Sequence, residues 1–353
     1  MTDKIYKRLI KFPSIDQFST VATNINRHFT FVGLDENGDA IYDKTLQKPK
    51  LKFKGRVKLH GTNGSVCHNE PSGMWTQSRE RIITTESDNA GFAFFTQTKE
   101  EILTNLFEQV REKNNVDLNS NTISIYGEWC GSNIQSTVGL TNLEKSFFIF
   151  GVKISPFGEE EPAYWVDHSY LRSPENNIYN IDDYETFEIE IDFNVPQLSQ
   201  NKLNELALQV EAECPVAKAF GYPNTIGEGI VWSTELNGVI HRMKIKGSLH
   251  AGKSKVKTLK VVDDVKIMKC LELADKVTPI WRLSQMLEQT FDFMNGGLMT
   301  REKLGEYIKA VTTDIVKEEI LLLTEYELEL KDIGKYVSEI SRKYFFEQET
   351  ERM

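Results

Sequence analysis

The segment that most constrains the fold is a basic strand between residues 50 and 64, which ends in a lysine and a glycine turn. Apolar Leu51, Phe53 and Val57 lie among basic residues: Lys50, Lys52, Lys54 and Arg56. Such alternation is typical of a strand whose two faces meet different surroundings. Gly61 indicates a tight turn in which the backbone bends close to another group. Lys58 therefore lies at the strand end, where the sheet holds the side chain while the amine still reaches a ligand.

This lysine is a candidate nucleophile. A lysine amine attacks only after it has lost its proton, and burial or nearby cations favour the uncharged form. Lys52, Lys54 and Arg56 could supply such cations. We also expect Gly61 to leave room for a phosphate group beside the amine. The alternative, a solvated lysine at the end of a basic strand, stays open on this segment alone.

Length and composition bound the class of protein. A chain of 353 residues is long enough for two domains with separate cores. No apolar run is long enough to span a membrane, and the residues after Met1 lack the apolar core of a signal peptide. Four widely spaced cysteines favour reduced thiols without a zinc site: Cys67, Cys130, Cys214 and Cys270. We therefore expect a cytoplasmic protein with no membrane partner.

The net charge of -10 argues weakly against nucleic-acid binding, because contacts to phosphate dominate such affinity. The basic residues, however, gather in two runs: Lys48 to Lys58, and a second that comprises Arg242, Lys244, Lys246, Lys253, Lys255, Lys257 and Lys260. Acidic residues lie elsewhere, for example at 185–192. A basic face on an acidic protein fits a polyanionic partner, although charge alone leaves two solvated strands as an alternative.

Three further strand-like segments carry candidate site residues. Arg79 closes a strand pair over 65–79, and we favour it over Arg81 as a candidate site residue for that reason. Glu128 follows the strand 123–127 and is flanked by Gly127 and Gly131, which favours close approach of a ligand. The apolar strand 146–154 contains Phe150; alternation places Phe148, Phe150 and Val152 on one face.

A hairpin over 227–247 brings a carboxylate and two lysines together. Asn237-Gly238 is a turn signal between the two strands. A plain two-residue turn would place Glu228 opposite Gly247, with Lys244 and Lys246 facing away from it. A three-residue turn with a glycine bulge would place Glu228 opposite Lys246 on one face. We predict the three-residue turn, with a solvated cross-strand ion pair as the alternative interpretation.

The remaining segments predict secondary structure without chemistry. Asn37-Gly38 predicts a hairpin between 31–32 and 41–42, the spacing of apolar residues predicts helices over 99–112 and 201–212, and 155–200 is expected to be rich in loops. After Lys260 the pattern is helical, with Thr278-Pro279 and Thr300 as helix starts and Asn295-Gly296-Gly297 as a separator. We expect an α+β domain over 1–253 and a small all-α domain over 254–353.

Five segments, in their order along the chain, resemble the motifs of the RNA ligase 2 family, the ATP-dependent RNA ligases of phages and of kinetoplastid editing complexes. The six residues Lys58-Leu59-His60-Gly61-Thr62-Asn63 resemble the nucleotide-attachment motif; the segments at Glu128, Phe150, Glu228 and Lys244-Ile245-Lys246 resemble the later ones. The resemblance implies a nucleotidyltransferase (adenylation) domain of antiparallel sheets with flanking helices, followed by a helical C-terminal domain. Val57 and Gly64 depart from the family's usual Glu and Phe.

The resemblance also implies roles. Lys58 would form a lysyl-AMP with ATP, Glu128 would bind the ribose, Phe150 would stack on adenine, and Arg79 would contact phosphate. Lys244 and Lys246 would neutralise phosphate charge, Glu228 would help to hold Mg²⁺ or Mn²⁺, and His60 and Asn63 would act around the nucleotide and in later steps.

The expected function is ATP-dependent joining of RNA 3′-hydroxyl and 5′-phosphate ends through lysyl-AMP and RNA-adenylate intermediates, at nicks in duplex RNA or RNA-containing hybrids. We expect a monomer of phage type in the host cytoplasm. The alternatives are a DNA ligase or an mRNA guanylyltransferase with the same Lys-x-x-Gly scheme, or a nucleic-acid-binding module without catalysis. Those two enzymes usually carry Asp at the position of His60 and a barrel after the fifth motif, where this chain is helical.

Overall fold

The computed structural model describes residues 6–35, 38–43, 45–135, 138–158, 161–250, 261–291, 293 and 297–352. The chain divides into two compact units. The first comprises the described residues of 1–21, 51–191 and 202–260, and the second those of 22–50, 192–201 and 261–353. The boundary expected between residues 253 and 254, and the lysines at 253, 255, 257 and 260, lie outside the described residues.

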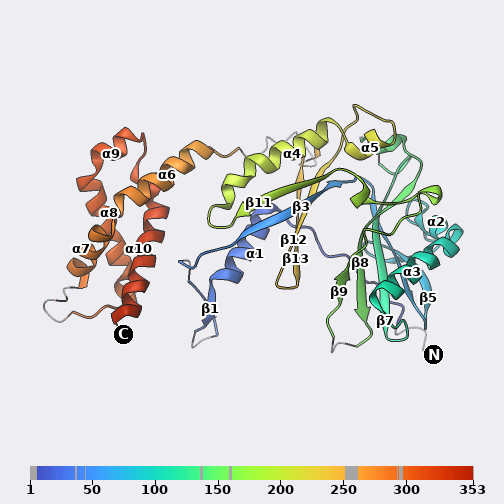
Figure 1. Cartoon of the computed structure of the whole chain (residues 1–353), viewed down its shortest axis with the longest axis horizontal. Helices are drawn as coiled ribbons and strands as arrows, with labels where there is room; N and C mark the ends of the chain where they lie inside the picture. The colour runs from blue at the N-terminus through green and yellow to red at the C-terminus, as the bar shows by residue number, and fades with distance from the viewer. Residues whose placement is uncertain are drawn as a thin grey trace. The chain divides into compact units, whose positions relative to one another are not determined.

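The larger sheet of the first unit has seven strands in the order β10-β8-β7-β4-β5-β6, with β9 paired to β8. Figure 1 labels β5, β7, β8 and β9 among them. Its neighbours are antiparallel except β10 and β8. The strands are β4 (Thr62–Asn69), β5 (Gly73–Ser78), β6 (Ile82–Ile83), β7 (Asn121–Cys130), β8 (Ser146–Pro156), β9 (Tyr164–Val166) and β10 (Ile178–Asn180).

One face of this sheet is covered by α2 (Phe92–Thr98) and α3 (Glu100–Asn114). The stripe predicted over 99–112 is the buried face of α3, and Asn115 ends that helix in the left-handed conformation. The core between helices and sheet includes Phe107 and Val110 of α3 and Ile125 and Ile149 of the strands. α2 was not expected from the sequence.

The smaller sheet has four strands in the order β11-β3-β12-β13, and it carries the basic residues. The strands are β3 (Lys50–Lys58), β11 (Thr186–Asp192), β12 (Gly229–Leu236) and β13 (Val239–Lys246). Its buried residues include Phe53, Val57, Ile230, Trp232 and Met243. α4 (Gln200–Ala212) confirms the helix predicted at 201–212, and the short α5 (Pro215–Ala219) follows it. β11 lies in the stretch that was expected to be rich in loops.

The second unit contains the C-terminal helices: α6 (Asp264–Val277), α7 (Ile280–Phe291), α8 (Leu304–Glu318), α9 (Ile320–Glu325) and α10 (Leu330–Arg352) (Figure 1). These helices share an apolar core that contains Leu283, Val311 and Phe345. The expected helical tail is therefore confirmed, as is the α+β class with antiparallel sheets and flanking helices. No helix start had been predicted for α6 within this helical segment, and the side chain of Thr300 makes no capping hydrogen bond. Asn295 and Gly296 lie outside the described residues.

The second unit also contains part of α1 (Phe18–Thr30) and the hairpin of β1 (Phe31–Leu34) and β2 (Ala40–Tyr42). Antiparallel pairing of Phe31 with Tyr42 and of Leu34 with Ala40 confirms the hairpin predicted there. Glu36 and Asn37 of the predicted turn lie outside the described residues.

Candidate active site

Three strands of the smaller sheet align the cationic side chains on one face. Gly229 of β12 lies opposite Lys58 of β3 on one side and opposite Lys246 of β13 on the other. Two residues further along, Val231 lies between Arg56 and Lys244 in the same way. Residues opposite one another in an antiparallel ladder share a face, so the four cations lie on the same side of this sheet.

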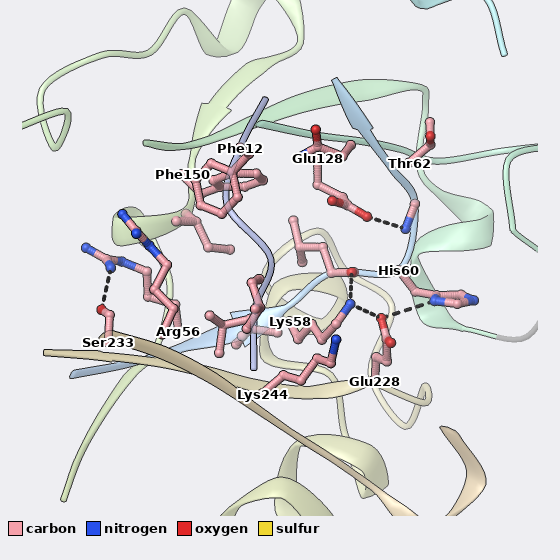
Figure 2. A pocket seen from close by; sticks show the side chains of 18 of the residues that line it. Phe12, Arg56, Lys58, His60, Thr62, Glu128, Phe150, Glu228, Ser233 and Lys244 are labelled. Atoms are coloured by element: carbon pink, nitrogen blue, oxygen red, sulfur yellow. Dashed lines mark hydrogen bonds and ion pairs between the residues drawn. The ribbon is translucent and has the colours of Figure 1, made fainter. Parts of the chain in front are cut away.

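This face forms one wall of a cavity of about 460 Å³. All nine residues that the sequence nominated line it: Lys58, His60, Asn63, Arg79, Glu128, Phe150, Glu228, Lys244 and Lys246. Figure 2 shows Lys58, Lys244 and Glu228 at one end and Phe12 and Phe150 at the other. Of the two arginines considered, Arg79 lines the cavity, whereas Arg81 binds Ser87 and the carbonyl oxygen of Asp88.

The register predicted for the β12–β13 hairpin is wrong. Leu236 pairs with Val239, so the turn has two residues, and Asn237 and Gly238 both have positive φ, at 51° and 77°. The amide of Gly247 donates to the carbonyl of Glu228 at 3.1 Å, so Glu228 lies opposite Gly247 and not opposite Lys246.

Glu228 nevertheless reaches the lysines. Gly229, the first residue of β12, has a φ of +141° and breaks the alternation there, which turns the Glu228 side chain to the face of the lysines. A Cβ atom at Gly229 would collide with the carbonyl oxygen of Ile245. The close approach of β13 therefore requires a glycine here.

The Glu228 carboxylate is the electrostatic centre of the site. It accepts from Lys58 Nζ at 2.7 Å through Oε2, and His60 Nδ1 lies 3.1 Å from the same oxygen (Figure 2). Through Oε1 it accepts from Lys246 Nζ at 2.6 Å. Its side chain is 1% exposed. Burial raises the pKa of Glu228, but the hydrogen bond from His60 and the attraction of the two lysines outweigh burial and hold the pKa well below its usual range. Glu228 is therefore an anion held by three partners.

Glu128 is the second carboxylate of the cavity. Its Oε1 accepts from the amide of Gly61 at 2.9 Å. Burial raises the pKa of Glu128 to about 7, against the lowering effects of Lys58 and of the Gly61 amide. Burial and proximity to Lys246 and Lys58 lower the pKa of Lys244. The cavity thus contains one strongly ionised carboxylate, and one that titrates near neutral pH.

From the sequence, the glycines beside Lys58 and Glu128 were expected to leave room for a ligand, but the structure gives them another role. A Cβ atom at Gly61 would collide with the carbonyl oxygen of Trp129, and one at Gly127 with the ring of Phe147. At Gly131, whose φ is +130°, it would lie 2.8 Å from Lys145 Cα. These positions need glycine because neighbouring chain segments approach them closely, and the same approach brings the Gly61 amide to Glu128.

Phe150 enters the cavity because of a β-bulge. Tyr126 pairs with Gly151 and Gly127 pairs with Ile149, so Phe150 is the extra residue on β8. A bulge re-aims one side chain and shifts the alternation that follows it. Val152 accordingly packs in the core with Ile149, so its predicted position on the Phe150 face is wrong.

The N-terminal segment supplies cavity residues that the sequence did not indicate. Ile10 is anchored to the larger sheet by Gln77 and Tyr126, and Asp16 bonds to the main chain of β13 at Arg242 and Lys244. Between these anchors Phe12, Pro13 and Ile15 line the cavity. The Phe12 ring makes an edge contact with Phe150 at 5.0 Å, and the Arg242 guanidinium lies 5.0 Å from the Phe12 ring. The hydrogen bonds of Ile10 and Asp16 involve main-chain atoms and partners that are distant in sequence. No local sequence pattern therefore predicts them.

Part of the expected basic face is neutralised. Asp182 binds Arg56 through two nitrogens, at 2.8 and 3.0 Å, and Lys54 at 2.7 Å. Lys50 lies 3.6 Å from Asp192. The expectation that Lys54 and Arg56 act as free cations beside Lys58 therefore does not hold, whereas Lys244 and Lys246 remain in the cavity.

Comparison with known proteins identifies the family. The model of the family described as RNA ligase matches residues 52–246, which is more than half of the chain and includes every predicted site residue. The chain belongs to the RNA ligase family. No curated protein matches the chain. In the described part of the chain, no helix is both long and apolar enough to cross a membrane.

Several solved structures are distantly similar to this RNA ligase family member. The Naegleria gruberi RNA ligase with PPi is 14% identical over 71% of this chain and 61% of its own, with a TM-score of 0.39. A lysine-to-alanine variant of that ligase with ATP and Mn is 14% identical over 69% and 58% (TM-score 0.39), and an arginine-to-alanine variant with ATP and Mn is 12% identical over 70% and 59% (TM-score 0.42). The chain thus spans about 60% of the length of these structures.

Proposed function

We propose that the chain is an ATP-dependent RNA ligase that joins RNA 3′-hydroxyl and 5′-phosphate ends. The observation that carries this proposal is the position of the Lys58 amine in the cavity, 2.7 Å from a carboxylate that also binds Lys246 and His60. A lysine oriented by a buried anion, with further cations beside it, suits attack on a nucleoside triphosphate.

In the first step, Lys58 Nζ attacks the α-phosphorus of ATP. The N–P bond forms, the bond to the bridging oxygen of the β-phosphate breaks, and pyrophosphate leaves with that oxygen. The Lys58 ammonium loses one proton to solvent before the attack, and the nitrogen loses a second after the N–P bond has formed. The product is a lysyl-AMP phosphoramidate with an uncharged nitrogen and one negative charge on its phosphate oxygens. Lys58 thereby loses its charge, and Glu228 keeps Lys246 and His60 as partners.

The other cavity residues would stabilise the charge that shifts during this transfer. Lys244 and Lys246 share the face of Lys58 and would bind phosphate oxygens, which favours a transition state with more charge on those oxygens. Glu128 would bind the ribose, and Phe150 would stack on the adenine at the apolar end of the cavity. Arg79, at the cavity edge, would contact phosphate.

In the later steps the AMP passes from Lys58 to an RNA 5′-phosphate, and a 3′-hydroxyl oxygen then attacks that phosphorus and expels AMP. By resemblance to the family, His60 and Asn63 serve these steps. We propose a nick in an A-form duplex as the preferred substrate, recognised through shape and 2′-hydroxyl groups, and action as a monomer in the host cytoplasm.

A divalent cation fits this site only together with the phosphates. Both Glu228 oxygens are bound to protein cations, and in the described residues no three histidine, cysteine or acidic side chains form a group that could hold a metal ion. Mg²⁺ commonly binds through one or two carboxylates plus substrate phosphates and water, and Glu228 and Glu128 provide such carboxylates. Bound Mg²⁺ or Mn²⁺ would offset phosphate charge.

The test is incubation of the protein with α-labelled ATP and Mg²⁺, followed by denaturing electrophoresis. We expect an acid-labile covalent AMP adduct in the wild type and none in Lys58→Ala. Wild-type protein without an adduct would contradict the proposal and favour a binding module, and preference for GTP would favour a guanylyltransferase. Sealing of nicked RNA, nicked DNA and single strands, measured side by side, then separates an RNA ligase from a DNA ligase.

A further inference from the structure

A buried glutamate outside the cavity holds both ends of the β12–β13 hairpin. Glu211, near the end of α4, is 6% exposed. Its carbonyl oxygen accepts from the amide of Gly227 at 3.3 Å, next to Glu228. Its carboxylate accepts from the amide of Leu249 at 2.8 Å and from Ser248 Oγ at 2.9 Å, just beyond Lys246. Glu211 thus bonds to the chain just before Glu228 and to the chain just after Lys246.

Both ends of the hairpin require a glycine because α4 approaches the main chain closely there. A Cβ atom at Gly227 would collide with the carbonyl oxygen of Val210, and one at Gly247 would collide with the Glu211 carboxylate. The end of α4 therefore packs directly on the main chain before Glu228 and after Lys246. Because the contact is this close, removal of the Glu211 carboxylate would leave the chain just after Lys246 without its packing partner and without two hydrogen bonds.

The turn that Glu211 holds also places a second imidazole beside His60. His250 ends the short helix Ser248–His250, and its side chain is 10% exposed. Its ring centroid lies 5.5 Å from that of His60, with the rings at 61°. His250 Nδ1 lies 3.8 Å from Glu211 Oε1 and has no hydrogen-bond partner among the described residues. The His250 ring thus packs against the residue that binds Glu228.

We propose that Glu211 is a positioning residue of the ligase site. It fixes the separation of Glu228 and Lys246 through the two ends of their hairpin, and it holds His60 in place through His250. It contacts no reacting atom. The expected effect of Glu211 on the reaction rate rests on the proposed function. Its expected effect on the β12–β13 hairpin does not.

The kinetic test compares Glu211→Ala, Glu211→Gln and Glu205→Ala in single-turnover formation of lysyl-AMP over a range of ATP concentrations. Glu205 is an exposed residue of the same helix that pairs with Lys202, so its variant controls for changes in α4. Misplacement of a catalytic group by about 1 Å costs about 10²-fold in rate. We expect a loss of that order in the maximal rate of Glu211→Ala. The KM for ATP should change little, because Phe150 lies at the other end of the cavity.

Glu211→Gln should recover most of the rate. Its amide oxygen can accept from Leu249, and its amide nitrogen can donate to Ser248. A folded Glu211→Ala variant with the wild-type maximal rate would overturn the proposal. So would Glu211→Gln being as slow as Glu211→Ala, because the hydrogen bonds would then not be the cause.

Hydrogen exchange separates this proposal from the proposed function. Amides in 247–249 should exchange faster in Glu211→Ala than in wild type or Glu205→Ala, whether or not the protein reacts with ATP, because Leu249 loses its side-chain acceptor. The Gly227 amide keeps its main-chain acceptor and serves as an internal reference. Unchanged exchange over 247–249 would overturn the proposal even in an active ligase. If the wild type formed no AMP adduct, the proposed function would be contradicted. The hydrogen-exchange result would then still test whether Glu211 holds the hairpin.

Two further variants test whether His250 supports His60. His250→Ala removes the ring beside His60 and should slow sealing of a pre-adenylated RNA nick, whereas His250→Phe keeps a ring there and should recover part of that rate. Full sealing activity in His250→Ala would show that His60 needs no support from this ring.

Discussion

Lys246 donates to Glu228 over 2.6 Å, although Gly229 and not Glu228 lies opposite Lys246 in the ladder of β12 and β13. The pair forms because Gly229 has a φ of +141°, a conformation that L side chains rarely adopt. The first glycine of β12 thus brings Glu228 to the lysines, as a shift of register was expected to do, and its backbone conformation decides where the buried anion lies.

Gly229→Ala should separate Glu228 from the lysines. The new Cβ atom would meet the carbonyl oxygen of Ile245 in a strained backbone conformation, so we expect destabilisation of about 3 kcal/mol and loss of most adenylyl transfer. Gly238→Ala is the matched control, since its φ is +77° but no atom lies within 4 Å of the Cβ position. It should cost about 1 kcal/mol and leave the reaction unchanged. Urea unfolding and adduct formation measure both; equal effects of the two variants would contradict the explanation.

Glu128→Gln should change how stability depends on pH. Burial raises the pKa of Glu128 in the folded protein to about 7 from 4.5. Between these values the folded state holds a proton that the unfolded state has released, so wild-type stability falls as pH rises from 4.5 to 7. Glutamine does not titrate and can still accept from the Gly61 amide. The advantage of the variant should therefore grow over this window to about 3 kcal/mol above pH 7, since each pKa unit is worth about 1.4 kcal/mol, measured by urea unfolding at several pH values. A difference that does not vary with pH would refute the assignment.

Phe150→Ala should weaken ATP binding more than it slows the reaction. Stacking of a base on an aromatic ring is worth about 1–3 kcal/mol, so KM for ATP in adduct formation should rise about tenfold or more while the maximal rate changes little. Phe94, which is 62% exposed on α2, provides a matched aromatic control. Phe150→Ala and Phe94→Ala giving the same KM would exclude Phe150 from the base site.

Arg282→Met should destabilise the helical unit. The Arg282 side chain is 2% exposed and binds Asp314 at 2.9 Å and Glu319 at 2.6 Å. Removal of one partner from a buried ion pair leaves the remaining charges poorly compensated and costs about 3 kcal/mol. Arg301 pairs with Glu349 but is 68% exposed, so Arg301→Ala should cost less than about 1 kcal/mol. Thermal unfolding that ranks the two variants the other way would contradict this view.

Local patterns were sufficient for much of the chain. The alternation in 50–58 predicted β3, the helical spacing in 99–112 predicted α3, and the order of five segments predicted both the family and the residues that meet in one cavity. These features depend on residues near one another in sequence, because strand and helix periodicity are local properties. Lys58 at a strand end and Glu228 at a hairpin end were found for that reason.

Tertiary contacts decided the rest. Three features depend on how separate segments approach one another: the close approach of Ile245 to Gly229, the extra residue at Phe150 and the placement of Phe12. The same holds for the pairing of Arg56 with Asp182, which removes a cation that the sequence had assigned to the site. The sequence by itself determined which residues are candidates for the chemistry, and only the packing of distant strands decided which charges face one another, because an ion pair depends on distance in space and not on separation along the chain.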